Sequence, residues 1–203
     1  MIRKTLLVTA GAMLLVAATA SAQATMTPSF NAPDRPFARS EFGAVVSFPD
    51  GGGTAYEGAY RIASRSVDIG LRGGVMDYNG AASSQLLAGV EARANMIRHG
   101  TNFPLDGALI FGGGGRFESG QSRIDVPLGL SLGRRVPLHG SSVSFQPYVQ
   151  PTAFLRAGNN MSTNVIYTLG LGTDLNMGGA FNARLGVGVG DVEGVSLGAV
   201  WTH

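Results

Sequence analysis

The chain has 203 residues and no cysteine, and with 31 glycines and 14% charged residues it is richer in glycine and poorer in charge than a typical soluble domain. This length suits one domain or two small ones. The absence of cysteine excludes a disulfide framework and a thiolate metal site.

Residues 1–22 have the three-part layout of a secretory signal peptide. Arg3 and Lys4 precede an apolar run that ends at Ala18, and a small-x-small cleavage site follows. The run is shorter than the roughly 20 residues that a membrane-spanning helix needs. We therefore expect cleavage after Ala22, with cleavage after Ala24 as the alternative.

Removal of this leader leaves a chain that is close to neutral. Two of the 15 basic residues belong to the leader, so 13 basic residues remain against 13 acidic ones. All 13 are arginine, because Lys4 is the only lysine, and they form no basic stripe. The composition therefore does not support nucleic-acid binding.

Two regions with different patterns follow the leader. Residues 23–40 contain Pro28, Pro33 and Pro36 and show no clear periodicity over their length, which predicts a short extended linker. From Glu41 onward almost every segment alternates with a period of two, which is typical of β-strands with two different faces.

Turn signals between the alternating segments predict an antiparallel meander of about ten strands. We expect these strands near 41–48, 55–63, 67–77, 85–97, 105–117, 123–135, 143–156, 164–176, 180–189 and 193–201. A count of eight is the alternative if the weakest hairpins are wrong. No long amphipathic helix follows the leader.

The two faces of these strands indicate a membrane barrel. One face is apolar and nearly free of charge over about nine to eleven residues, a length that crosses a bilayer as a tilted strand. The other face is small and polar, with charges of both signs and no lysine, which suits a narrow interior. Because lipid leaves no backbone group unpaired, the sheet must close on itself. The predicted fold class is therefore all-β: a closed, antiparallel, up-and-down transmembrane β-barrel over 41–203.

The charged side chains of the polar face are the candidates for a network of paired charges in the lumen. They are Glu57, Arg61, Asp68, Arg72, Glu91, Arg93, Asp106, Arg116, Arg123, Asp125, Asp174 and Arg184. We favour a salt-bridged plug, because a barrel of eight to ten strands is nearly filled by its own side chains. The alternative is a narrow pore whose selectivity these charges set.

Four consecutive glycines, Gly112 to Gly115, raise the question of a phosphate-binding loop. Such a loop requires a following helix and a Lys-Ser/Thr pair, and the residues after Gly115 supply neither. We therefore expect a strand in which Gly112 and Gly114 face the lumen, where they leave space for other side chains or permit a bend.

The histidines offer little support for catalysis. His99 and His139 fall in strand connections and His203 ends the sequence, so we expect solvated histidines rather than a catalytic base. No two of them lie at metal-ligand spacing. The sequence predicts no catalytic, cofactor or metal site.

Aromatic residues gather near the ends of the expected strands, and several should belong to interfacial girdles. They are Phe42, Phe48, Tyr56, Tyr60, Phe103, Phe117, Phe145, Tyr167, Phe181 and Trp201. The connections expected on the outer side, near 49–54, 79–84, 118–122, 157–163 and 190–192, are all short. Short outer loops argue against recognition of a large partner.

The leader, the alternating strands and the C-terminal stretch GVSLGAVW resemble the small outer-membrane β-barrel proteins of Gram-negative bacteria, the OmpA-like and Opa-like barrels. The resemblance covers 41–203 and implies contact with outer-membrane lipid and insertion by the barrel assembly machinery. It departs at the end, where Trp201 is followed by Thr202 and His203 instead of ending the strand. We expect no peptidoglycan-binding domain, because the chain has no room for one.

The resulting expectation is an integral outer-membrane barrel with a structural or narrow-pore role and no enzymatic activity. Two alternatives remain: a lipid-modifying outer-membrane enzyme, and a soluble periplasmic barrel that binds an apolar ligand. The second alternative requires the apolar face to point inward.

Overall fold

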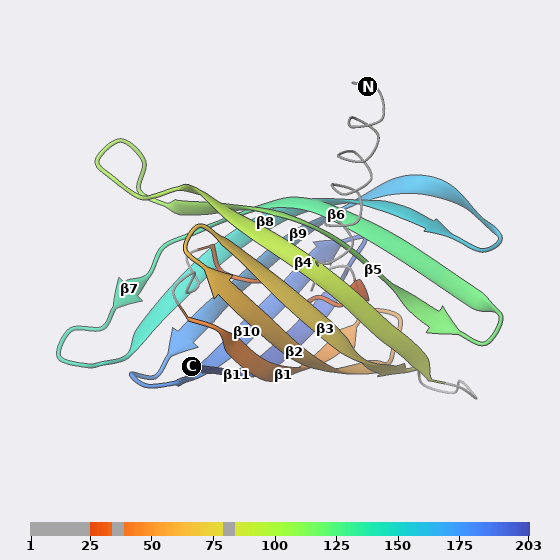
Figure 1. Cartoon of the computed structure of the whole chain (residues 1–203), viewed down its shortest axis with the longest axis horizontal. Helices are drawn as coiled ribbons and strands as arrows, with labels where there is room; N and C mark the ends of the chain where they lie inside the picture. Colours follow the sequence, from red (N-terminus) through yellow and green to blue (C-terminus); the bar gives the residue numbers. More distant parts are fainter. Residues whose placement is uncertain (1–24, 34–38, 79–83) are drawn as a thin grey trace, which may run out of the picture.

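The computed structural model describes residues 25–33, 39–78 and 84–203. Its strands form one antiparallel sheet (Figure 1). They are β1 (Glu41–Pro49), β2 (Thr54–Ser64), β3 (Val67–Asp77), β4 (Gln85–Ile97), β5 (Asp106–Glu118), β6 (Gln121–Gly133), β7 (Val136–Pro137), β8 (Ser144–Gly158), β9 (Met161–Asn176), β10 (Phe181–Gly190) and β11 (Gly194–Thr202). In the described part of the chain, no helix has the length and apolar character needed to cross a membrane.

The sheet closes into a barrel of ten long strands. Successive long strands pair with one another, β1 pairs with β11, and β6 pairs with β8. The two-residue strand β7 pairs with the edge of β8 near its start and does not interrupt the ring. The predicted all-β, up-and-down barrel is thus confirmed, with ten strands rather than eight.

The expected strand boundaries agree closely with the observed ones, and the largest difference has a local cause. The strand expected from residue 164 begins at Met161, because β8 and β9 are joined by a tight turn at Asn159 and Asn160. Asn160 adopts a positive φ of 59°, a conformation that asparagine tolerates better than most residues. The turn therefore lets both strands extend further than the sequence pattern indicates.

The strand connections lie alternately at two ends of the barrel. One end, which we call the terminus end, holds the start of β1, the end of β11 and the connections 65–66, 98–105, 134–143 and 177–180; we call the other the far end. The far end holds the end of β3, the start of β4 and the connections 50–53, 119–120, 159–160 and 191–193. Most of the expected connection at 79–84 falls outside the described residues.

The strands place charge inside and large apolar side chains outside. In β3, Val67, Ile69 and Leu71 are exposed, while Asp68 and Arg72 between and beside them are buried. The same alternation runs along β2, β6, β9 and β10. This distribution is opposite to that of a soluble domain, whose large apolar side chains are buried.

The four consecutive glycines lie within β5. Gly112 to Gly115 pair in register with the β4 residues Glu91 to Ala88, and β5 continues to Glu118 with no helix after it. A side chain at Gly113 would meet no atom within 4 Å, so this position faces open space outside the barrel wall. The glycines therefore belong to a strand and do not form a phosphate loop.

Aromatic rings gather on the outside of the terminus end. Phe42, Phe181 and Trp201 are neighbours on β1, β10 and β11, with ring centroids 5.8 Å apart for Phe42 and Trp201 and 5.2 Å for Phe181 and Trp201. Tyr60 stacks on His203 at 6.1 Å. The strand register thus brings together aromatic residues that are far apart in the sequence.

Candidate functional site

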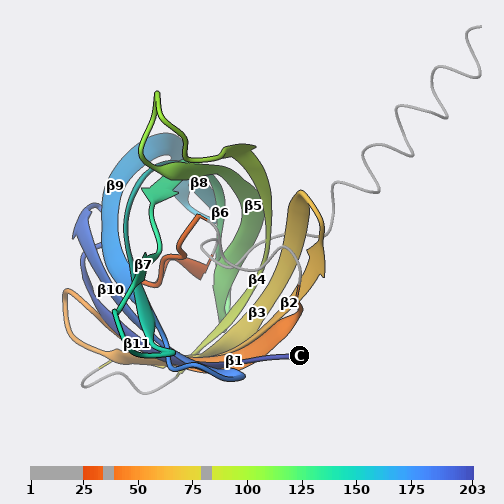
Figure 2. The same ribbon diagram turned by 90° about the vertical axis from the view of Figure 1, so that its left-hand side faces the viewer.

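The interior of the barrel is occupied by residues 25–33, which we call the lumen segment. Figure 2 shows the segment, in red, surrounded by the strands. Every residue from Thr25 to Pro33 is buried. The sequence predicts only a linker here, so this location is the main feature that its pattern did not reveal.

The lumen segment runs from the far end of the barrel to the terminus end. Met26 packs with Phe154, Ile166 and Val192, and Val192 belongs to a far-end connection. At the other end of the segment, Pro33 lies beside Gly133, the last residue of β6 at the terminus end. A segment of this length can reach about 30 Å when extended, similar to the hydrocarbon thickness of a bilayer.

Polar residues of the lumen segment are bound by side chains from the barrel wall. The Thr27 hydroxyl donates to Glu57 Oε2 at 2.8 Å, and Arg72 Nη2 donates to the Ser29 hydroxyl at 2.9 Å. Arg184 Nη1 donates to Asn31 Oδ1 at 2.6 Å. These contacts satisfy buried polar groups that would be costly to leave unpaired.

The backbone of the lumen segment is held in the same way. Arg93 Nη1 donates to the Ala32 carbonyl oxygen at 2.6 Å. The hydroxyls of Ser131 and Ser196 donate to the carbonyl oxygens of Asn31 at 2.7 Å and of Pro28 at 2.9 Å. An irregular backbone inside the barrel requires such partners, because no strand is available to pair with it.

Glycines on the wall provide the space for Phe30. A Cβ atom on Gly170 would lie 2.5 Å from Phe30 Cγ, and one on Gly188 would lie 3.3 Å from Phe30 Cε2. A Cβ on Gly186 would lie 3.1 Å from the Pro28 carbonyl oxygen. Part of the glycine-rich inner face is therefore explained by close approach of the lumen segment.

Candidate charges in the terminus-end half of the lumen form one connected cluster, which we call the Arg61 cluster. Arg61 pairs with Asp68, with Glu91 Oε1 at 2.9 Å and with Glu41 Oε1 at 3.6 Å. Arg93 approaches the same Asp68 with Nη2 2.6 Å from Oδ2. Asp68 therefore accepts from two guanidinium groups, which permits this carboxylate and both arginines to remain charged while buried.

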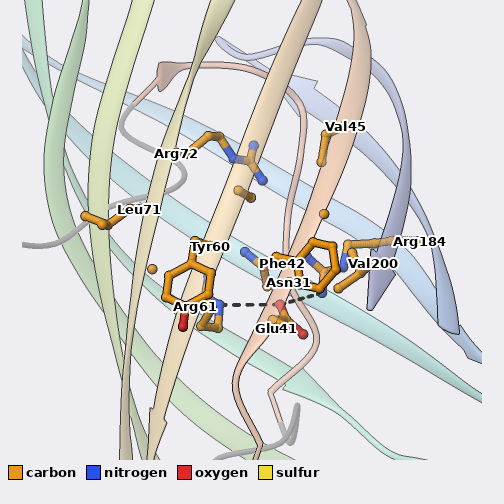
Figure 3. Close-up of a pocket in the computed structure, with 13 residues that line it drawn as sticks. Asn31, Glu41, Phe42, Val45, Tyr60, Arg61, Leu71, Arg72, Arg184 and Val200 are labelled. Carbon is orange, nitrogen blue, oxygen red and sulfur yellow. Dashed lines mark hydrogen bonds and ion pairs between the residues drawn. The ribbon is translucent and has the colours of Figure 1, made fainter. Parts of the chain in front are cut away.

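Glu41 links this cluster to the other side of the barrel (Figure 3). Its Oε1 lies 3.2 Å from Arg184 Nη2, and Arg184 Nε lies 3.0 Å from Asp174 Oδ1. The sequence places Glu41 on the polar face but not among the candidate network residues. The closure of β1 against β11 and β2 brings it between Arg61 and Arg184.

A cavity between these side chains has almost no free volume. It is bordered by Asn31, Glu41, Arg61 and Arg184 and has a volume of about 10 Å³. This is room for about one water molecule. At this point the lumen segment and the charges around it leave little free space between them.

The other candidate residues make different contacts. Arg72 Nη1 lies 3.5 Å from Glu57 Oε2, so this pair surrounds Thr27. Asp106 lies apart at the terminus end, where its Oδ2 is 2.8 Å from His99 Nδ1. His99 is half exposed and was expected to be a solvated histidine; nothing in its sequence position points to this contact.

Three arginines lie together at the far end of the lumen. Arg116 donates to the carbonyl oxygens of Thr25 and Met26 and to the hydroxyl of Tyr78. Arg123 and Arg156 share the buried carboxylate of Asp125, at 3.3 Å and 3.0 Å. Arg156 faces inward on β8 opposite Asp125 and is absent from the sequence candidates.

Among the described residues, no group of three or more histidine, aspartate or glutamate side chains is arranged to hold a metal ion. The carboxylates of the Arg61 cluster contact guanidinium groups instead.

Comparison with known proteins supports the fold and gives no family. No protein-family model matches the chain, and no curated protein sequence matches it. A solved structure, the beta domain of the Bordetella autotransporter BrkA, is similar with a TM-score of 0.52 and 14% sequence identity, over 81% of this chain and 98% of that one. At this identity the likeness concerns the barrel fold alone, and the OmpA-like or Opa-like resemblance stays a prediction.

Proposed function

We propose that this protein is an integral outer-membrane β-barrel whose lumen is closed by its own N-terminal segment, so that its role is structural rather than conducting. The observation that carries the proposal is the inverted distribution of side chains. Arg61, Asp68 and Arg93 are buried in the lumen, while large apolar residues such as Leu128 and Val165 are exposed on the outside. Such an exterior is compatible with lipid and would aggregate in water.

The aromatic cluster at the terminus end fits this proposal. Phe42, Tyr60, Phe181 and Trp201 form a band on the outer surface at one level of the barrel. Aromatic residues favour the interface between lipid and water, where the ring contacts both. We infer that this band marks one membrane interface, with the terminus end periplasmic and the far end outside the cell.

The first experiment is fractionation of cells that produce the full chain, followed by a detergent gel of boiled and unboiled samples. The proposal requires recovery from the outer-membrane fraction, cleavage of the leader and a different gel position before boiling. Recovery from the soluble periplasm, without a heat-dependent shift, would overturn it. The soluble ligand-binding alternative also needs the apolar face inside, whereas the described strands have it outside.

The closed lumen is tested in planar bilayers. The wild-type barrel should show no resolved conductance, because the lumen segment is buried inside the barrel and bound to its wall. Deletion of residues 25–33 should open a conducting path if the barrel still folds, which the unboiled gel position reports. Steady conductance of the wild-type protein would favour the narrow-pore alternative and contradict closure.

The proposal includes no catalytic step. A lipid-modifying activity of the purified protein that is lost in the variant His99→Ala, while the heat-dependent gel shift remains, would replace the structural role with the enzyme alternative. His139→Ala is the matched control, because His139 lies in another terminus-end connection.

A second candidate function is presentation of the start of the mature chain at the cell surface. It follows from the direction of the lumen segment. Because Thr25 lies at the far end, chain that precedes it would leave the lumen on that side. The solved structure with a similar barrel is described as an autotransporter beta domain, and the second candidate is a barrel that presents the start of its mature chain at the cell surface. An epitope inserted between Ala24 and Thr25 should then bind antibody on intact cells. Binding only after the cells are permeabilised would exclude this candidate while leaving the structural role intact.

A further inference from the structure

A second cavity lies at the far end of the lumen and is larger than the cavity beside Arg61. It has a volume of about 150 Å³ and its lining includes the three arginines Arg116, Arg123 and Arg156 together with Tyr78 and Met26. This volume is sufficient for several water molecules or for an anion of the size of phosphate.

The arginines at this cavity keep hydrogen-bond donors to spare. Arg123 and Arg156 each use Nε to contact Asp125. Within the described residues, the η nitrogens of Arg123 have no hydrogen-bond partner, and Nη2 of Arg156 has only the Met26 sulfur at 3.9 Å. Arg116 is different, because all three of its nitrogens donate to neutral oxygens.

The contacts of these arginines leave part of their donor groups unmatched. Among the described residues, Arg123 and Arg156 share the carboxylate of Asp125, while Arg116 donates to neutral oxygens. In the Arg61 cluster, by contrast, Arg61 alone faces three carboxylates. Guanidinium donors without a partner at a partly enclosed site can bind an anion.

Acidic residues also line the cavity. They are Asp50, Asp191 and Glu193, all in far-end connections and exposed to solvent. Water and salt screen exposed charges more strongly than buried ones. The Asp191 carboxylate is also engaged, accepting from the Tyr167 backbone N–H at 2.8 Å. These exposed carboxylates should weaken anion binding without abolishing it.

We propose that the far-end cavity binds a phosphate-sized oxyanion through the guanidinium groups of Arg123 and Arg156. Arginine presents parallel N–H groups that match two oxygens of a phosphate or carboxylate. The anion would accept from the guanidinium N–H groups that Asp125 leaves unpaired, and Arg116 would hold the end of the lumen segment against the base of the site. This inference is independent of whether the barrel conducts.

The test is isothermal titration of the folded full-length protein in detergent with inorganic phosphate at constant ionic strength. The wild-type protein should bind saturably, and Arg123→Gln and Arg156→Gln should each weaken binding by at least about tenfold, since a lost charge-assisted hydrogen bond is expected to cost this much. Arg135→Gln is the matched control, because Arg135 is exposed at the terminus end and loses the same charge. If Arg156→Gln does not fold, the more exposed Arg123 still provides the test.

A second titration uses micelles that contain phosphatidate, whose headgroup is a phosphate monoester. Binding of free phosphate identifies a soluble anion, whereas arginine-dependent binding seen only with phosphatidate assigns the site to a lipid headgroup. No saturable binding of either probe would overturn the proposal. Binding that is equally strong in Arg123→Gln, Arg156→Gln and Arg135→Gln would overturn it as well.

Discussion

The contact between Gly170 and Phe30 gives the sharpest test of the lumen segment. Replacement of Gly170 by alanine adds one methyl group to the inner face of β9, and its Cβ would lie 2.5 Å from Phe30 Cγ and 2.8 Å from Cε1. Both distances are far below an ordinary carbon–carbon contact. Since Phe30 is only 1% exposed, its ring has little room in which to move.

The expected cost follows from the two ways in which the protein can respond. If the ring stays, the interior is overpacked; if the ring leaves, its burial is lost. Either response should lower the free energy of unfolding by about 1–3 kcal/mol. The double variant Gly170→Ala/Phe30→Ala should lose less free energy of unfolding than the two single variants lose together, because the smaller side chain at position 30 removes the collision.

The assay is urea unfolding of the protein folded in detergent, followed by the fluorescence of Trp201, the only tryptophan. Because the chain has no cysteine, the variant Ser29→Cys supplies a second readout. Ser29 is 1% exposed, so a thiol there should react slowly with a labelling reagent and faster when Gly170→Ala is added.

Gly113→Ala is the matched control. It adds the same methyl group to another strand, where a Cβ would meet no atom within 4 Å. It should leave both the unfolding midpoint and the labelling rate close to those of the parent protein. Equal stability and equal labelling for Gly170→Ala and Gly113→Ala would refute the position of Phe30 and, with it, the packed lumen segment.

Three further predictions concern the charges and the outer surface. Asp68→Asn should lower the free energy of unfolding by about 3–5 kcal/mol in the same urea assay, because it weakens buried pairs with both Arg61 and Arg93. Leu128→Arg should destabilise the barrel in lipid vesicles by up to about 2–4 kcal/mol, because this exposed residue lies near the middle of β6 and would face hydrocarbon. Trp201 should be quenched by brominated lipid, because it belongs to the outer aromatic band.

Each of these predictions has its own control and contrary result. Asp50→Asn removes an exposed carboxylate and should have little effect; a similar loss for both aspartates would contradict the special role of Asp68. For Leu128→Arg the control is Leu128→Ala, and tolerance of arginine in vesicles would place β6 outside the membrane. Quenching of Trp201 by aqueous iodide but not by brominated lipid would contradict a membrane-facing band.

Several parts of the site could be predicted from the sequence because they depend on a local rule. A period of two assigns Arg61, Arg72 and Arg93 to one face of their strands, and a polar face rich in small residues indicates the interior. The pairs themselves could not be predicted. Arg61 reaches Glu91 only through the register between three strands, and Glu41 reaches Arg184 only because the barrel closes.

The lumen segment shows a different limit of sequence reasoning. Thr25, Thr27, Ser29 and Asn31 alternate with apolar residues, a short signal that three nearby prolines obscured. In a strand, alternation means one polar and one apolar environment. Inside the barrel both sides of the segment are enclosed, so its pattern reflects which part of the wall each residue meets.

The sequence by itself determined the strands, their number to within one hairpin and the inward and outward faces, because side-chain alternation is a property of the extended backbone and needs no partner. Only the tertiary structure decided what fills the barrel. Closure of β6 on β8 and of β11 on β1 creates an interior whose shape belongs to no single strand. Glycines on β9 and β10 and charges from most of the wall then meet the lumen segment there, through contacts between residues that are 30 to 168 positions apart in the sequence.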